Sequence, residues 1–201
     1  MKGNIKKLAL VVVIAAIPML IAVATASAVG QTIQGNYAIT GYCTTLISMT
    51  GFNTSLQPNG GAWFTQSGSW QGVLTFNKDG TGSYTGIEYN SEVYAPGMNL
   101  PPDSSSSNTS YGFTYTIDDG DITFTYVTGS FEADFTSGPN VPGKGYITIP
   151  QPWGGTISSD GKSIHVWWGV LIEMTADKAN TTLTGMQGMS NATFHGFKVN
   201  E

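Results

Sequence analysis

Large apolar residues alternate with polar ones over two neighbouring segments in the middle of the chain. In 111–117 the aromatic and aliphatic side chains occupy the odd positions, and in 122–126 they occupy the even positions. A period of two places such side chains on one face of a β-strand and leaves the threonines on the other face. The acidic segment 118–121 contains a glycine and separates the two runs, and Asp-Gly sequences favour tight turns between antiparallel strands. We therefore predict a β-hairpin from Tyr111 to Tyr126.

The same arrangement occurs twice more along the chain. Segments 70–76 and 83–89 flank the sequence Asn-Lys-Asp-Gly-Thr-Gly, and segments 156–158 and 163–174 flank Ser-Asp-Gly-Lys. Each pair predicts a further hairpin, and most of these runs are about seven residues long. Segment 131–135 also alternates and predicts a strand with one solvated face. Weaker strand candidates are Tyr37–Ile39, Tyr146–Ile149, Thr181–Thr184 and Thr193–Val199.

These segments predict roughly eight to ten antiparallel strands joined mostly by short turns. An open sheet of that size would leave unpaired backbone amides along its edges. We therefore predict an all-β, up-and-down meander closed into a barrel, with a two-sheet sandwich as the alternative. Two stretches rich in Pro, Gly, Ser and Asn, 90–110 and 138–143, interrupt the pattern and are predicted to be loops.

The beginning of the chain has the three parts of an export signal. Three lysines among the first seven residues precede an apolar stretch, 8–23, and a small-x-small sequence ends at Ala28. We predict cleavage after Ala28, so that 1–28 is a signal peptide and 29–201 is a single β-barrel domain, periplasmic or extracellular. A retained membrane anchor is the alternative, because the apolar stretch approaches the length of a spanning helix.

Charge and cysteine content narrow the class of protein further. Only 10% of the 201 residues are charged, none is arginine, and the part after residue 28 holds five lysines against 13 acidic residues. Such a chain cannot release counterions from a phosphate backbone, which excludes nucleic acid as a partner. Cys43 is the only cysteine and is expected to be a small buried side chain. An exported chain without disulfides is typical of a bacterial or archaeal envelope.

Candidate catalytic and metal-binding groups are few. His165 and His195 are the only imidazoles, no Gly-x-Ser-x-Gly motif occurs, and a joint role would require their strands to be adjacent. The acidic turn at 118–121 is too short to supply the roughly six to eight oxygen ligands of calcium. Glu132 and Asp134 share a strand face, which a solvated surface explains. We therefore expect no catalytic residue, no metal and no cofactor.

Aromatic side chains point instead to binding. A barrel interior lined by aromatic rings with few charges suits a small apolar ligand or a sugar. Trp168 belongs to the apolar stripe of 163–174, so its neighbour Trp167 must point to the opposite side of the sheet. The predicted ligand-binding residues are Trp70, Phe113, Tyr115, Phe124, Tyr126 and Trp168, and the predicted surface aromatics are Trp153 and Trp167.

Four motifs are spread along most of the chain after residue 28. They are an early Gly35-Asn36-Tyr37 and the turn segments 76–82, 115–120 and 157–164. Together they resemble the bacterial exported lipocalin-like proteins of the calycin type. Lipocalins usually carry Trp where this chain has Tyr37, and the late Arg that packs over that Trp has no counterpart here. The resemblance implies a cup-shaped barrel that binds small, mostly apolar molecules.

The leading hypothesis is a non-enzymatic exported β-barrel that binds a small, mostly apolar ligand in its interior. An envelope or surface domain that binds glycan or protein through Trp153 or Trp167 is the first alternative. A cyclase or isomerase in a similar barrel is the second, and it would need a polar group such as Glu173 or His165 inside the cavity. Membrane contact is expected only through the signal segment, and the pattern leaves the oligomeric state open.

Overall fold

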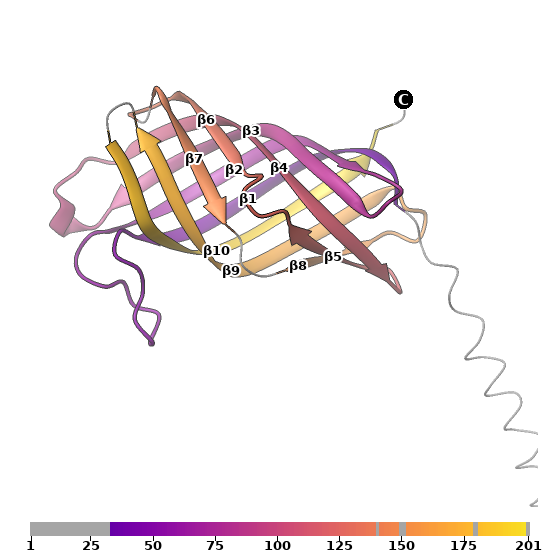
Figure 1. Cartoon of the computed structure of the whole chain (residues 1–201), viewed down its shortest axis with the longest axis horizontal. Coiled ribbons are helices and arrows are strands. Elements are labelled where there is room, and N and C mark those ends of the chain that lie inside the picture. The colour runs from indigo at the N-terminus through magenta and orange to yellow at the C-terminus, as the bar shows by residue number, and fades with distance from the viewer. Residues whose placement is uncertain (1–32, 140, 149–151, 179–180, 200–201) are drawn as a thin grey trace, which may run out of the picture.

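The computed structural model describes residues 33–139, 141–148, 152–178 and 181–199. Within these ranges, no helical segment has the length and the apolar composition that a membrane span requires. The predicted signal peptide, its cleavage site and the alternative of a membrane anchor lie outside the described residues. In chain order, as coloured in Figure 1, the elements are β1 (Gly35–Ser48), β2 (Trp63–Phe76), β3 (Thr81–Tyr94), the short 3-10 helix η1 (Pro96–Met98), β4 (Asp103–Asp118), β5 (Asp121–Tyr126), β6 (Glu132–Ser137), β7 (Gly143–Thr148), β8 (Trp153–Ile157), β9 (Ser163–Lys178) and β10 (Thr181–Lys198).

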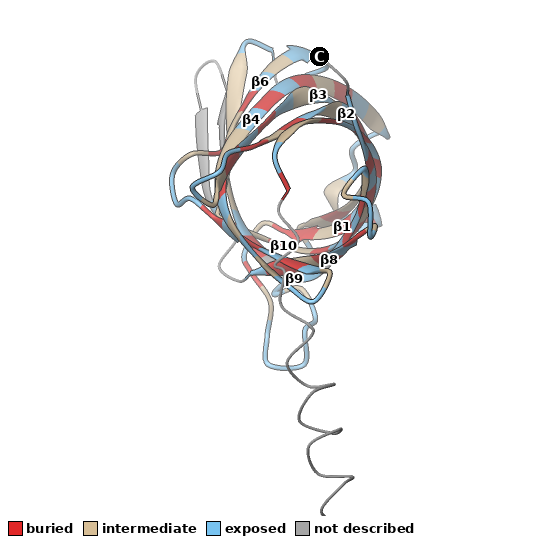
Figure 2. Ribbon diagram, turned by 90° about the vertical axis from the view of Figure 1, so that its right-hand side faces the viewer, coloured by how far each residue is buried: buried red, intermediate tan, exposed pale blue. Residues whose placement is uncertain are grey.

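The strands close into a barrel. From β1 to β5 each strand pairs with the next, β5 pairs with β8, β8 with β9, β9 with β10, and β10 returns to β1. Every one of these pairings is antiparallel. Figure 2 looks along the barrel and shows the strands as a ring. The predicted all-β meander with barrel closure is confirmed, and the sandwich alternative is wrong.

Two positions in this ring are filled by interrupted strands (Figure 1). One part of β4, 113–118, pairs with β5, and another part, 106–110, pairs with β6. In the same way, β9 pairs with β8 through 164–167 and with β7 through 173–178. Therefore β5 and β6 act as one broken strand, β7 and β8 act as a second, and the wall has eight strand positions in all.

Side chains bridge the break between β5 and β6. The Ser130 hydroxyl accepts the N–H of Gly112 at 2.9 Å and lies 3.2 Å from the carbonyl of the same residue. The Tyr126 hydroxyl donates to the carbonyl of Ile147 at 3.0 Å, which ties β5 to β7. Unpaired backbone groups in a buried wall cost free energy, so these bonds hold the interrupted strands in the ring.

All three predicted hairpins are present, and their turns use glycine where the chain must turn sharply. Gly80, Gly120 and Gly161 have φ values of 81°, 86° and 65°, a region that side chains with a Cβ rarely adopt. In two of the turns Asp79 and Asp160 accept a backbone N–H from two residues further on. Hydrogen bonds from the hydroxyls of Thr81 and Ser158, and secondarily these backbone bonds, favour the carboxylates and lower the pKa of Asp79 and Asp160.

The long strands exceed the length that the pattern predicted. The expectation of about seven residues is wrong for five strands, since β1, β2 and β3 have 14 residues, β4 has 16 and β10 has 18. The strand predicted to be long over 163–174 corresponds to β9, which has 16 residues. The predicted loop 90–110 is mostly strand, because β3 continues to Tyr94 and β4 begins at Asp103. Serines have little intrinsic preference for strands, but β3 and β6 pair with the serine-rich start of β4 on both sides. The second predicted loop, 138–143, does connect β6 to β7.

Aromatic rings fill the packed half of the barrel, by which we mean the half that ends in the three Asp-Gly turns. Tyr37, Phe76, Phe113 and Phe124 are each 1% exposed or less. The rings of Phe76 and Phe113 meet edge to face with centroids 5.5 Å apart. The Tyr37 hydroxyl donates to the carbonyl of Gly161 and so fastens β1 to the β8–β9 turn. Tyr37 thus closes this end of the barrel.

Polar side chains point inward in the opposite, polar half. The Thr45 hydroxyl donates to that of Ser190 at 3.0 Å. The buried carboxylate of Glu92 accepts the Gln66 amide at 3.1 Å and the Tyr94 hydroxyl at 2.6 Å. Because buried polar groups are costly only when they lack partners, this half can be polar and still stable.

Candidate ligand-binding cavity

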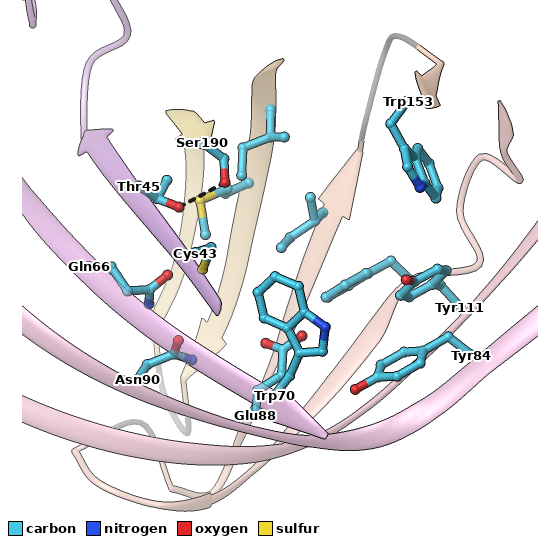
Figure 3. A pocket seen from close by; sticks show the side chains of 14 residues that line it. Cys43, Thr45, Gln66, Trp70, Tyr84, Glu88, Asn90, Tyr111, Trp153 and Ser190 are labelled. Carbon is cyan, nitrogen blue, oxygen red and sulfur yellow. Dashed lines mark hydrogen bonds between the residues drawn. The ribbon is translucent and has the colours of Figure 1, made fainter. Parts of the chain in front are cut away.

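A cavity lies inside the barrel where the packed and polar halves meet (Figure 3). Its volume, taken as the space in which the centre of a water molecule fits, is about 70 Å³. This is room for about five waters, and together with the adjoining cavity described next it approaches the roughly 150 Å³ of an apolar cavity that binds benzene. Its apolar lining comprises Trp70, Phe131, Ile147, Trp153, Ile172 and Met174, and its polar lining comprises Cys43, Thr45, Gln66, Tyr84, Glu88, Asn90, Tyr111 and Ser190.

A second cavity of about 70 Å³ adjoins the first, because the two share part of their lining. The shared polar residues are Gln66, Glu88 and Asn90. From there the second cavity extends towards Phe135 on β6 and Met186 on β10. A ligand that touches these three polar groups can therefore place its apolar part in either cavity.

Glycines at inward positions of β1, β2 and β3 create the space. A Cβ on Gly41 would lie 2.7 Å from Cε2 of Trp70, and a Cβ on Gly86 would lie 2.2 Å from the Tyr84 hydroxyl. A Cβ on Gly68 would likewise lie 2.5 Å from Oδ1 of Asn90. Each of these glycines is thus covered by the side chain of a neighbour. The large side chains lie against the wall, and the centre of the barrel stays open.

Glu88 brings a carboxyl group into this space. It lies on β3, directly opposite Trp70 on β2 and Ser107 on β4. Protein surrounds it, and the surface that it retains faces the cavity. Burial raises the pKa of the Glu88 carboxyl to about 7, although a hydrogen bond from the Thr109 hydroxyl favours the carboxylate. Near neutral pH this carboxyl can therefore accept a proton, donate one or pair with a cation.

Three other titratable side chains that face the cavity stay neutral. Burial, and secondarily the charge of Glu88, raises the pKa of the Cys43 thiol to about 11, so Cys43 carries no reactive thiolate at neutral pH. The rings of Tyr84 and Tyr111 lie 4.9 Å apart, and burial raises the pKa of both phenols well above the usual value. Glu88 is consequently the group of this set that changes charge near pH 7.

The structure places the aromatic residues predicted to bind ligand in different environments. Trp70 lines the cavity. Phe113 and Phe124 fill the packed half, so they support the cavity floor but do not line the cavity. Tyr115 and Tyr126 use their hydroxyls to bind backbone carbonyls, Tyr115 at the packed end and Tyr126 at the interrupted strands.

The tryptophans of β8 and β9 lie on opposite sides of the wall. The prediction that Trp153 is a surface residue is wrong, because it is 4% exposed and lines the cavity. Trp153 pairs with Phe124 across β5 and β8, which turns both inward, and their rings stack with centroids 5.4 Å apart. Trp167 is 48% exposed and faces outward, as predicted. The side chain of Trp168 lies outside the described residues.

The histidines lie on adjacent strands but outside the barrel. His165 and His195 are directly opposite on β9 and β10, and their rings stack with centroids 4.3 Å apart. His165 also hydrogen-bonds the Thr193 hydroxyl at 3.0 Å. Both histidines and Glu173 are exposed. Across the described residues, no group of three or more metal-ligating side chains is found.

The acidic residues of β6 are held by a lysine on the outer face. Lys144 on β7 contacts Glu132 and lies 3.2 Å from the carboxylate of Asp134. The side chains of Glu132 and Asp134 are 42% and 53% exposed, so both carboxylates belong to a surface ion-pair cluster and do not face the cavity.

The sequence pattern did not reveal Glu88 as a cavity residue. In β3 the apolar Ile87 and Tyr89 share one side and the aromatic Tyr84 shares the other with Glu88, so hydrophobicity alone does not decide which side faces the interior. The structure leaves Ile87 37% exposed and Tyr89 50% exposed. Gly86 is the signal that could have decided the side, since it shares the side of Glu88 and a narrow barrel needs small residues inside.

No family model matches the chain, and a search of curated proteins finds no match either. Arguments about function therefore depend on the geometry of the cavity.

Proposed function

We propose that this protein is a non-enzymatic, exported β-barrel that binds one small, mostly apolar molecule in the central cavity. The observation that carries the proposal is an enclosed space whose wall is largely aromatic and aliphatic and which exists because inward glycines leave room for it. Lipocalin-like kinship and release to the periplasm or the extracellular space belong to the same proposal. They rest on the sequence motifs and on the amino-terminal signal pattern.

The physical basis of binding is the removal of apolar surface from water. Each Å² of apolar surface buried contributes roughly 25 cal/mol, and aromatic walls add ring contacts. Trp70 and Trp153 both line the cavity, so an occupant changes the surroundings of two indole rings. Intrinsic tryptophan fluorescence is therefore a direct reporter of occupancy.

Filling the cavity from the wall tests the proposal. Gly68 faces inward, and the atoms nearest to an added Cβ are side-chain ends of Asn90 and Cys43, which can move aside. We expect toluene, indole and benzyl alcohol to change the fluorescence of the processed wild type and to raise its melting temperature. The variant Gly68→Leu should lose these responses. Ser69→Leu adds the same side chain one residue later, at an exposed position, and should retain them.

The titration has a clear negative outcome. If no probe alters either the fluorescence or the melting temperature of the wild type, the interior does not bind small molecules and the proposal is wrong. The proposal is also wrong if a folded Gly68→Leu binds the probes as tightly as Ser69→Leu does.

A surface-binding function has one observation in its favour. Trp167 is 48% exposed on the outer face of β9, and its ring lies 5.4 Å from that of His165. Loss of glycan or cell-wall pull-down in Trp167→Ala, at unchanged stability, would support this second candidate. Trp153, which is buried, cannot contribute to such a surface.

A further inference from the structure

We infer that the occupant of the cavity is an organic cation, a protonated amine on a small aromatic or aliphatic body, with Glu88 as its counter-ion. This inference rests on the proposed function and specifies its ligand class. Its basis is a buried carboxyl group that faces the cavity, lacks a cationic partner among the described residues and lies among aromatic rings.

No basic side chain of the described residues reaches this carboxyl group. The chain contains no arginine. Lys144 and Lys162 form ion pairs with acidic residues at the outer surface, and both histidines lie on the outer face. Neither cavity has a lysine or a histidine in its lining. None of the described side chains supplies a positive charge next to Glu88, which leaves this role to a bound molecule.

The two inward carboxyl groups of β3 differ in how many hydrogen bonds they accept from the protein. Glu92 accepts hydrogen bonds from the Gln66 amide and the Tyr94 hydroxyl. Glu88 has a hydrogen bond from the Thr109 hydroxyl, which leaves most of its acceptor capacity open to the cavity. An ammonium group carries several N–H donors and no acceptor, so it complements Glu88 better than it complements Glu92.

Aromatic rings around Glu88 favour a cation further. Trp70 is its direct cross-strand neighbour, and neighbours of this kind have Cβ atoms about 5 Å apart. Figure 3 shows Trp70, Tyr84 and Tyr111 around the same cavity as Glu88. The negatively polarised faces of such rings attract a desolvated cation, while the apolar lining holds the remainder of the molecule.

The chemistry also predicts how binding depends on pH. An amine pairs with the carboxylate form of Glu88, whose pKa without ligand is about 7 because of burial. The other titratable groups that face the cavities are Cys43 from β1, Tyr84 from β3, Tyr111 from β4 and Tyr146 from β7. The thiol and the two buried phenols carry no charge between pH 6 and 8. The affinity for an amine should therefore rise roughly tenfold over this range as Glu88 ionises.

Calorimetric titration with benzylamine, benzyl alcohol and toluene tests the inference. The first two probes are close in size and shape and differ mainly in charge. We expect the wild type at pH 8 to bind benzylamine at least roughly tenfold more tightly than benzyl alcohol. Glu88→Gln, which keeps the shape of the side chain, should lose this preference and still bind benzyl alcohol. Asp121→Asn removes one charge from the exposed face of β5 and should behave like the wild type.

The outcomes separate this inference from the proposed function. Binding of benzyl alcohol or toluene at least as tightly as benzylamine would overturn the amine assignment and leave the small-molecule function intact. Absence of binding by all three probes would overturn both. Should Glu88→Gln fail to fold, the pH series on the wild type decides alone, and a benzylamine affinity that is flat between pH 6 and 8 would overturn the inference.

Discussion

The ionisation of Glu88 should make the empty barrel less stable as the pH rises towards neutral. Its carboxyl pKa is about 7 in the folded chain, compared with 4.5 for an unperturbed glutamate. The folded state therefore holds a proton that the unfolded chain releases, and the stabilisation present below pH 4.5 is lost as the pH rises through 7. A shift of this size corresponds to about 3 kcal/mol in the free energy of unfolding.

Denaturation in urea at a series of pH values measures this effect. Glu88→Gln removes the titrating group and keeps the side-chain shape, so the free energy of unfolding of the variant should gain about 3 kcal/mol relative to the wild type between pH 4.5 and 7.5. Subtracting the two profiles cancels the contributions of all other titrating groups. Asp121→Asn, on an exposed outward position, controls for the loss of one negative charge.

Parallel pH profiles for the wild type and Glu88→Gln would refute the reasoning. They would mean that water reaches the carboxylate freely and that the interior around β3 is not the enclosed space described above. This experiment uses no ligand, so its outcome is independent of which molecule the barrel binds.

Two further predictions concern stability at other points of the wall. Trp153→Ala should lower the free energy of unfolding, measured by chemical denaturation, by about 3–5 kcal/mol, because the ring is 4% exposed. Trp167→Ala, at a 48% exposed position, should lower it by less than about 1 kcal/mol. Equal losses in the two variants would contradict the placement of the two rings. Gly41→Ala should lower the melting temperature, because its Cβ would lie 2.6 Å from a backbone oxygen, and Gly169→Ala, with open space around it, should leave the melting temperature close to that of the wild type. Equal melting temperatures for both alanine variants would show that the barrel wall yields at Gly41.

The hairpins could be predicted from sequence because their signals are local. Alternation of apolar and polar residues fixes the strand, and an Asp-Gly turn fixes where the chain reverses. The start of β4 could not be predicted in this way. Its serines form a strand only because β3 and β6 pair with it, and those pairings join residues that are distant in sequence.

The candidate site was predictable only in part for a similar reason. An aromatic interior follows from the alternating pattern, and Trp70 was found in this way. The position of Trp153 depends on β7 and β8 together forming one broken strand. No local sequence motif indicates this arrangement. The inward direction of Glu88 depends on how little room the closed ring leaves, which favours Gly86 over the larger Ile87 on the inner side.

The inward glycines determine the size of the cavity but take no part in the outer surface of the barrel. Replacing a hydrogen by a methyl group at Gly68, where the nearest atoms are side-chain ends of Asn90 and Cys43, would resize the chamber without altering the outer surface of the barrel. A series of related barrels could therefore change the bound ligand through substitutions at inward positions of this kind and keep the contacts of the outer surface unchanged. Hence two barrels with nearly identical outer surfaces could bind different ligands.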